Sequence, residues 1–271
     1  MHAKPKKSLG QNFLVDKNIR AKIVSACSFM PEDILFEVGS GRGELTLLFS
    51  TQVKKLFSVE IDSRLYDDLQ VKLSSCSNCL LVKADILKIN LAQFLAEQKV
   101  SKKIKIFGNI PYYISSPLIE YFINYRDLID EIFITVQKEY AQRLVASAGS
   151  KAYGSLSCFA QYYLQAKPLF HISKNSFYPA PKVDSSFLSL KPRSKKNYLV
   201  CDEQLFFKII RGAFNQRRKT LRNSLEDIVP QGVLEGFLKQ AGLDKNIRPE
   251  SLNLGEFAAL SNYMKKMIKK G

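Results

Sequence analysis

Short runs of β-branched and aromatic residues alternate with stretches of helical periodicity through the first half of the chain. Five such runs are found at residues 34–38, 56–60, 80–84, 105–108 and 131–136. Apolar runs of this length predict buried strands. Because they alternate with helical segments, they predict a doubly wound parallel sheet of the α/β class.

The pattern changes in the second half of the chain. Two more β-like segments, at 169–172 and 185–190, are followed by the charged stretch 191–197, which predicts a linker. We therefore expect a sheet-containing domain over residues 1–190 and a small all-helical domain over residues 198–271. In the second domain apolar residues recur at helical spacing, as at Leu205, Phe206, Ile209, Ile210 and Phe214.

The fourth predicted strand is followed by the tetrapeptide Asn109-Ile110-Pro111-Tyr112. Open α/β sheets bind ligands at the carboxyl ends of their strands. The side-chain oxygen of Asn109 and the backbone carbonyl of Ile110 can each accept a hydrogen from the exocyclic amine of adenine, and Tyr112 offers a face on which a base can stack. A simple proline turn after a strand is the alternative interpretation of this motif.

The first predicted strand leads into Gly39-Ser40-Gly41-Arg42-Gly43. Glycines let a ligand approach the backbone closely. We expect a helix to begin near Glu44, with Leu47, Leu48 and Phe49 on its inner side. The spacing is G-x-G-x-G, whereas nicotinamide-binding domains carry G-x-G-x-x-G. An ordinary tight turn would also account for a lone glycine loop.

Carboxylates end the next two strands. Glu60 is suited to bind ribose hydroxyls, and Asp85 can accept a hydrogen bond from the amino group of an adenine ring. Because the carboxyl ends of parallel strands meet at one edge of a sheet, these residues predict one cofactor cleft. With Asn109 on the fourth strand, the order predicts an S-adenosylmethionine methyltransferase.

Two other segments complete the predicted site. Phe177 begins a proline-stiffened loop and could close on the far face of a base that stacks on Tyr112, although a core phenylalanine anchoring a loop would look similar. Residues 10–14 (Gly-Gln-Asn-Phe-Leu) precede a helix expected at Asp16. Their mixture of polar and apolar side chains suits a flap over a cofactor, and a simple helix N-terminus fits as well.

Composition narrows the choice of partner. The 271 residues include 41 Lys and Arg against 25 Asp and Glu, a formal charge of +16. This excess favours a polyanion, either nucleic acid or an anionic membrane surface. No stretch approaches the roughly eighteen uninterrupted apolar residues of a membrane span. Residues 1–7 are basic but lack the apolar core of a signal peptide, so we expect a cytoplasmic protein.

The cysteines and histidines predict neither a disulfide framework nor a metal site. Five cysteines are an odd number, which favours reduced thiols. Cys76 and Cys79 form one C-x-x-C pair, but a structural zinc needs further ligands and there is no second such pair. His2 and His171 stand in no catalytic pattern.

Positive charge is concentrated near the carboxyl end. From residue 191 onward there are 17 basic and 8 acidic residues, a net charge of +9. The densest patch opens a predicted helix and consists of Arg217, Arg218, Lys219 and Arg222. A patch of one sign predicts contact with RNA phosphates, and a solvated charged face is the alternative.

These motifs resemble the kasugamycin-sensitivity family of bacterial small-subunit (16S) ribosomal RNA adenine N6,N6-dimethyltransferases. The resemblance runs from residues 10–14 to the final helices and is most specific at 213–225. It implies a Rossmann-like class I methyltransferase sheet with a helical C-terminal domain. Tyr113 departs from it, since many members carry Asn there. The S-adenosylmethionine site implied by the resemblance is formed by Asn12, Leu14, Gly39, Glu60, Asp85 and Asn109.

The resemblance also implies a substrate and a partner. The product would carry two methyl groups on each of two adjacent adenines, in a hairpin near the 3′ end of small-subunit ribosomal RNA. The partner would be an immature 30S subunit, approached by a monomer without a membrane or a metal. Two alternatives are a large-subunit ribosomal RNA methyltransferase of the macrolide-resistance type and a mainly non-catalytic ribosome-assembly factor. The 213–225 signature argues for the small-subunit enzyme over the resistance enzyme.

Overall fold

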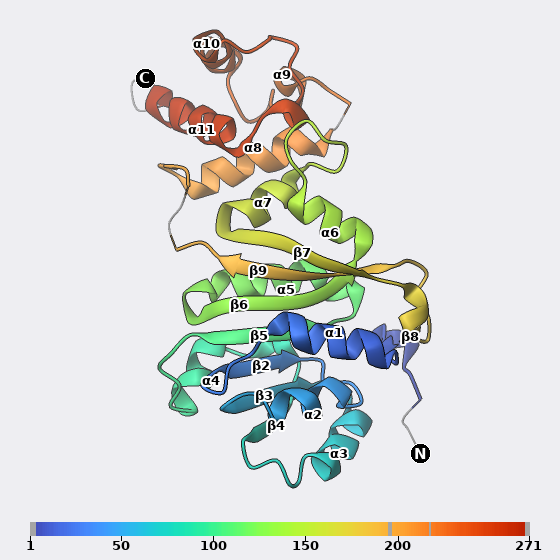
Figure 1. Cartoon of the computed structure of the whole chain (residues 1–271). Helices are drawn as coiled ribbons and strands as arrows, with labels where there is room; N and C mark the ends of the chain where they lie inside the picture. Colours follow the sequence, from blue (N-terminus) through green and yellow to red (C-terminus); the bar gives the residue numbers. More distant parts are fainter. Residues whose placement is uncertain (1–3, 195–196, 217, 269–271) are drawn as a thin grey trace. The chain divides into compact units, whose positions relative to one another are not determined.

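The computed structural model describes residues 4–194, 197–216 and 218–268 (Figure 1). The chain forms two compact units. The first unit contains Met1–Ala141 and Leu164–Pro192, and the second contains Gln142–Tyr163 and Arg193–Gly271.

The first unit is built on a seven-stranded sheet in the order β4-β3-β2-β5-β6-β9-β7. The parallel strands are β2 (Ile34–Val38), β3 (Lys55–Glu60), β4 (Cys79–Lys83), β5 (Ile104–Asn109) and β6 (Ile129–Gln137). The antiparallel strands are β9 (Ser185–Pro192) and β7 (Leu164–Ile172). The predicted doubly wound α/β sheet is therefore confirmed, with an antiparallel pair added at one edge.

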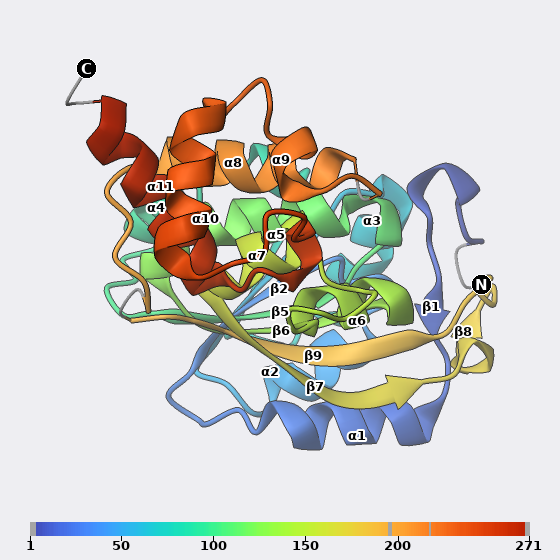
Figure 2. The same ribbon diagram turned by 90° about the horizontal axis from the view of Figure 1, so that it is seen from above.

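Helices cover both faces of this sheet (Figure 2). Side chains of a strand alternate between faces, so Leu35 packs in a core with residues of the helices on one side. Its neighbour Phe36 packs edge-on against Phe94 of a helix on the other side. The helices on the Leu35 side include α1 (Lys17–Cys27) and α2 (Glu44–Ser50), and those on the Phe36 side include α4 (Leu91–Glu97) and α5 (Ser115–Asn124).

One detail of α2 differs from the prediction. Leu45, Thr46 and Phe49 are buried, whereas Leu47 is 37% and Leu48 is 43% exposed. The expectation that Leu47 and Leu48 face inward was therefore wrong. With 3.6 residues per turn, a face that contains position 45 returns at position 49 and turns positions 47 and 48 outward.

A two-stranded antiparallel sheet joins segments far apart in the chain. Strand β1 (Phe13–Leu14) pairs with β8 (Phe177–Tyr178), so that Leu14 lies opposite Phe177. The backbone N–H of Val15 extends this pairing by donating to the Ser176 carbonyl, 2.9 Å away. Helix α1 begins at Lys17, next to the position expected from the sequence, and Asp16 caps it by accepting from the N–H groups of Asn18 and Ile19.

The second unit is helical. It contains α7 (Ser155–Tyr163), α8 (Glu203–Asn215), α9 (Leu221–Ser224), α10 (Gln231–Ala241) and α11 (Leu254–Ile268). α6 (Lys138–Val145) begins in the first unit and ends in the second. None of the helices in the described part of the chain has the length and apolar character needed to cross a membrane.

The boundaries of the units differ from the expected ones. The sequence pattern predicts residues 142–163 as part of the first domain, but they belong to the second unit because Tyr153, Cys158 and Tyr162 pack into its core. Lys191 and Pro192 were assigned to a linker, yet they complete β9 opposite residues of β7. Neither difference has a local signal in the sequence, since both depend on packing with distant segments.

Candidate functional site

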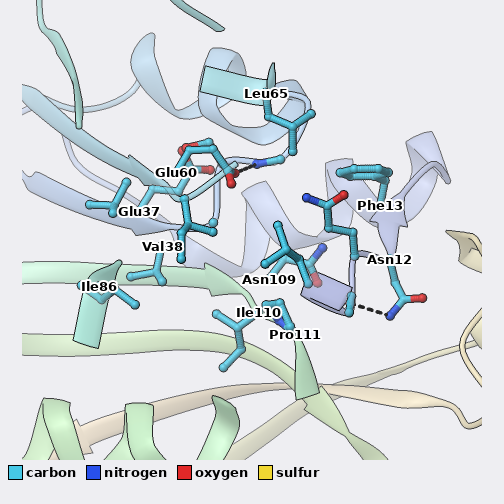
Figure 3. Close-up of a pocket in the computed structure, with 18 of the residues that line it drawn as sticks. Asn12, Phe13, Glu37, Val38, Glu60, Leu65, Ile86, Asn109, Ile110 and Pro111 are labelled. Atoms are coloured by element: carbon cyan, nitrogen blue, oxygen red, sulfur yellow. Dashed lines mark hydrogen bonds between the residues drawn. The ribbon is translucent and has the colours of Figure 1, made fainter. Parts of the chain in front are cut away.

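The carboxyl ends of β2, β3 and β5 border a cavity of about 280 Å³ in the first unit. Figure 3 shows Glu60, Asn12 and Asn109 on its walls. All of the residues predicted to bind a cofactor or an adenine line this one cavity: Asn12, Leu14, Gly39, Glu60, Asp85, Asn109, Ile110, Tyr112 and Phe177. The structure thus brings together residues that are separated by up to 165 positions in the sequence.

The loop between β2 and α2 places glycine at three positions of positive φ, the first of which is Gly39 at 75°. Gly41 has a φ of 59° and Gly43 a φ of 82°, a region that side chains other than glycine rarely adopt. A Cβ on Gly43 would also overlap the side chain of Leu69. The backbone N–H of Gly41 donates to Oε2 of Glu60 over 2.9 Å, so the loop is tied to the end of β3.

Glu60 is held by backbone donors on both carboxylate oxygens. Its Oε1 accepts from the N–H of Asp62 at 2.9 Å, while Oε2 accepts from Gly41. Burial raises the pKa of Glu60 above its ordinary value, and these backbone hydrogen bonds offset only part of the increase. The carboxylate is therefore fixed in orientation while it lines the cavity.

A second buried carboxyl group lies beside it, on Glu37 of β2. Ser58 lies opposite on β3 and donates to Glu37 Oε2 over 2.6 Å, and Ser40 of the glycine loop is hydrogen-bonded to the same Ser58 hydroxyl. Burial raises the pKa of Glu37 to about 7. Glu37 was not predicted as a site residue, although a carboxylate inside an apolar strand is a visible signal in the sequence.

Asp85 and Asn12 approach the cavity from two loops. Asp85 follows β4 and caps the short 3-10 helix η2 (Ile86–Lys88) by accepting from the N–H of Leu87. Asn12 donates from Nδ2 to the Gly10 carbonyl at 3.1 Å, which bends the N-terminal segment just before β1. Both side chains are half-buried, so their polar atoms remain accessible from the cavity.

Asn109 is the last residue of β5. The preceding Gly108 lies opposite Val38, so the tetrapeptide and the glycine loop leave adjacent strands at the same level. A Cβ built on Gly39 would lie 4.0 Å from the Asn109 carbonyl oxygen. A Cβ on Gly108 would lie only 2.9 Å from Ile110, so glycine lets the chain turn tightly here.

The turn after Asn109 is stiffened by Pro111, whose φ is −58°. The next residue, Tyr112, starts the 3-10 helix η3 (Tyr112–Ile114). Its phenol oxygen lies 2.6 Å from the Ser185 hydroxyl at the start of β9. This hydrogen bond fixes one end of the Tyr112 ring on the sheet.

Phe177 lines the cavity but is only 4% exposed and belongs to the buried cluster around Leu14 and Ile23. In this conformation its ring anchors the loop, which was one of the two interpretations of the sequence. Stacking of Phe177 on a base stays a prediction, and it requires the β8 loop to turn more of the ring toward the cavity.

The predicted basic patch lies in the second unit. Arg218, Lys219 and Arg222 are exposed, and Arg217 lies outside the described residues. Two of the three also approach acids: Lys219 Nζ is 3.8 Å from Glu226, and an Arg222 guanidinium nitrogen is 3.3 Å from Glu235. Exposed pairs of this kind contribute little energy, so the cations stay available to phosphates.

Within the described ranges, no group of three or more His, Cys, Asp and Glu side chains is arranged to hold a metal ion. The sheet order, the glycine loop and the acids at the ends of β3 and β4 define the class of the protein as an S-adenosylmethionine-dependent methyltransferase.

Comparison with known proteins gives the family. The sequence model of a family described as "Ribosomal RNA adenine dimethylase" matches residues 2–266. The chain belongs to this family. It is an enzyme that methylates adenine in ribosomal RNA, with S-adenosylmethionine as the methyl donor.

Curated relatives match over nearly their full length. A protein of Caldanaerobacter subterraneus named "Ribosomal RNA small subunit methyltransferase A" is 39% identical over 267 residues, which cover 98% of this chain and 99% of the relative. A protein of the same name from Geobacillus thermodenitrificans is 40% identical over 264 residues, which cover 95% of this chain and 90% of the relative.

Solved structures share the fold. A dimethyladenosine transferase from Plasmodium falciparum superposes with a TM-score of 0.77 at 25% identity, covering 94% of this chain and 98% of the other. The 23S rRNA methyltransferase ErmE superposes with a TM-score of 0.73 at 22% identity, and the match covers 94% of this chain and 100% of the other. At this identity the second likeness concerns the fold alone.

Proposed function

We propose that this enzyme dimethylates the N6 amines of two adjacent adenines in a hairpin near the 3′ end of small-subunit ribosomal RNA. The observation that carries the proposal is the common cavity, on which Asn109 and Ile110 lie beside the glycine loop and Glu60. The names of the curated relatives, which refer to the small ribosomal subunit, support this choice of RNA.

In this proposal the cofactor occupies the part of the cavity between the glycine loop and Asp85. The residues present fit it, because a carboxylate can accept about four hydrogen bonds. Backbone N–H groups of Gly41 and Asp62 use two of those on Glu60, which leaves acceptor capacity for a ribose hydroxyl. Asp85 accepts from the amino group of the cofactor's adenine ring, and Asn12 and Leu14 cover the opposite side of the cofactor. When bound, S-adenosylmethionine supplies a methyl group on a positively charged sulfur.

The target adenine occupies the part of the cavity next to the tetrapeptide. The Asn109 side-chain oxygen and the Ile110 carbonyl each accept one hydrogen of the amine, which draws the nitrogen toward a tetrahedral, nucleophilic state. Tyr112 stacks on one face of the base, held through its hydroxyl by Ser185. Phe177 stacks on the other face after the β8 loop opens.

These residues act by position and charge. The amine becomes cationic as it is methylated, so its proton leaves to water without a strong base. The two oxygens that hold the amine stabilise the developing positive charge. No cysteine or histidine is among the described residues that line the cavity, and we propose direct transfer without a covalent enzyme intermediate.

The basic patch of the second unit serves RNA binding in this proposal. Arg217, Arg218, Lys219 and Arg222 contact the phosphate backbone, which gives affinity with little base specificity. The partner is an immature 30S subunit, bound by a monomer in the cytoplasm where subunits assemble. The net charge of +16 supports a polyanionic partner such as ribosomal RNA.

Methylation of purified subunits tests the proposal. The protein is incubated with labelled S-adenosylmethionine and either small or large subunits from cells that lack the gene, and the RNA is digested and analysed by mass spectrometry. We expect dimethyladenosine at two adjacent positions of small-subunit RNA. Labelling of large-subunit RNA instead would favour a resistance-type enzyme, and binding without labelling would favour an assembly factor.

A further inference from the structure

Asp62 lies two residues beyond Glu60, and its side chain is fully buried although it is charged. Four side-chain hydrogen bonds converge on its carboxylate. Lys6 Nζ donates to Oδ1 at 2.9 Å, Gln11 Nε2 donates to Oδ2 at 3.0 Å, and Arg64 donates to both oxygens from Nε and one terminal nitrogen. The hydrogen bond from Arg64, with those from Lys6 and Gln11, lowers the pKa of Asp62 well below its usual range.

Two of these donors come from the N-terminal segment Lys6–Leu14, more than 50 positions away in the sequence. The segment is folded on itself, because the Lys6 N–H donates to Gln11 Oε1 at 2.7 Å. Lys6 and Gln11 therefore bind Asp62 as one unit. A buried carboxylate with two cationic partners is a strong attachment point, since loss of its charge removes the anion to which Lys6 and Gln11 donate.

Besides binding Asp62, the same segment contacts residues that line the cavity at three places. Gly10 lies close to the side chains of Pro111 and Tyr113. A Cβ built on Gly10 would lie 3.3 Å from each of them. Phe13 lies under the Arg42 guanidinium, with 4.4 Å between the guanidinium carbon and the ring centre. Leu14 pairs with Phe177. The segment thus runs from Asp62, next to the end of β3, to the loop that carries Phe177.

We propose that Asp62 is a positioning residue, which holds the segment Lys6–Leu14 over the cavity and thereby slows the release of S-adenosylmethionine. The inference rests on the proposed location of the cofactor between Glu60 and Asn12. Asp62 acts through the segment and does not itself line the cavity. Its charge keeps Asn12 and Leu14 in place, so that the cofactor leaves only when the segment lifts.

The substitution Asp62→Asn tests this role. Asp62 also caps helix α3 (Ser63–Lys72) by accepting from the Arg64 N–H, and asparagine is an equally good cap. The variant therefore removes the charge and keeps the cap. We expect the dissociation rate of S-adenosylmethionine, measured by stopped-flow displacement, to rise about ten-fold, the scale of one charge-assisted hydrogen bond. The KM for the cofactor should rise, and kcat at saturating cofactor should stay within about two-fold of the wild type.

Asp202→Asn is the matched control. Asp202 caps α8 and forms an ion pair with Lys265 at 2.6 Å, so the substitution removes the same kind of charge and keeps the same kind of cap in the second unit. We expect it to leave cofactor release at the wild-type rate. Equal acceleration by the two variants would mean that general loss of stability, and not the segment, controls release.

Lys6→Met provides a second variant if Asp62→Asn folds poorly, since Lys6 is 41% exposed. It should accelerate release and trypsin cleavage after Lys7, and combining it with Asp62→Asn should add little to either. Release at the wild-type rate in both variants would overturn the role of Asp62. The proposed function is tested by a different measurement, the methylation of small subunits by the wild type. Unchanged cofactor release in the variants would therefore not contradict it.

Discussion

The cavity of the first unit and the basic patch of the second differ in how their residues are held. Cavity residues such as Glu60 and Asn109 end buried strands and are fixed by backbone hydrogen bonds or strand pairing. Patch residues such as Arg218 and Arg222 are exposed side chains on a turn and a short helix. A reacting amine needs oxygens at defined positions, whereas phosphates need only nearby charge.

This difference leads to different sensitivities. Buried carboxyl groups with raised pKa values make the cavity sensitive to pH, as at Glu37 and Glu60. Exposed cations make the patch sensitive to salt, because salt screens charges at the surface far more than charges in the interior. A substitution in one region should therefore leave the function of the other region unchanged.

Asn109→Ala should have the largest effect. Loss of one preorganised hydrogen-bond partner of the amine should reduce kcat by about two to three powers of ten. Cofactor and RNA affinities should change much less, because the substitution leaves the glycine loop and the patch in place. The measurement is single-turnover methylation of small subunits. Asn90→Ala, which removes the cap of α4 outside the cavity, is the control and should leave kcat unchanged. Near-normal turnover by Asn109→Ala would remove the proposed mechanism.

The contrast also explains what could be predicted from the sequence. Glu60, Asp85 and Asn109 could be predicted to meet because each follows a strand of one parallel sheet, and parallel strands align their carboxyl ends. The glycine loop was predictable for the same reason. Local patterns of this kind determine which residues approach a ligand closely.

The features that could not be predicted depend on long-range packing. Lys6 and Asp62 are 56 positions apart, and nothing near either residue marks the other as a partner. Ser58 gains its role only because β3 pairs with β2 in a register that sets it opposite Glu37. Residues 142–163 join the second unit through buried contacts with α8 and not through their own pattern.

Glu60→Ala should have the next largest effect, on the cofactor alone. A charge-assisted hydrogen bond to a ribose contributes roughly 1.5–3 kcal/mol, so the dissociation constant for S-adenosylmethionine should rise about ten- to hundred-fold. Affinity for the small subunit should remain near the wild-type value. Calorimetry with each ligand checks both expectations, and an unchanged cofactor dissociation constant would mean that the cofactor lies elsewhere.

Glu37→Gln should change how stability depends on pH. Burial gives Glu37 a pKa of about 7 in the folded protein, against 4.5 as its ordinary value. Between these values the unfolded chain loses the proton and the folded protein keeps it, so stability falls as pH rises and the penalty is complete above pH 7. From pH 5 to 8 the wild type should lose about 1–3 kcal/mol relative to Glu37→Gln.

Urea unfolding of both proteins at the two pH values measures this difference. Glu60 also has a raised pKa and contributes with the same sign in both proteins, so comparing the two isolates Glu37. Parallel pH profiles would show that Glu37 is ionised in the folded state throughout this range.

Replacing Arg217, Arg218, Lys219 and Arg222 together by Gln should have the smallest effect on catalysis. Each lost phosphate contact should reduce the slope of log affinity against log salt by roughly 0.7–0.9. Binding to small subunits should therefore weaken at low salt, while kcat at saturating subunits and the cofactor dissociation constant stay at wild-type values. The control replaces four other exposed cations of the second unit by Gln: Lys239, Lys245, Arg248 and Lys266. Filter binding across a salt series compares the two variants. An equal loss of slope in both would mean that total charge matters and the patch does not, and an unchanged slope in the first would make the patch a solvated face.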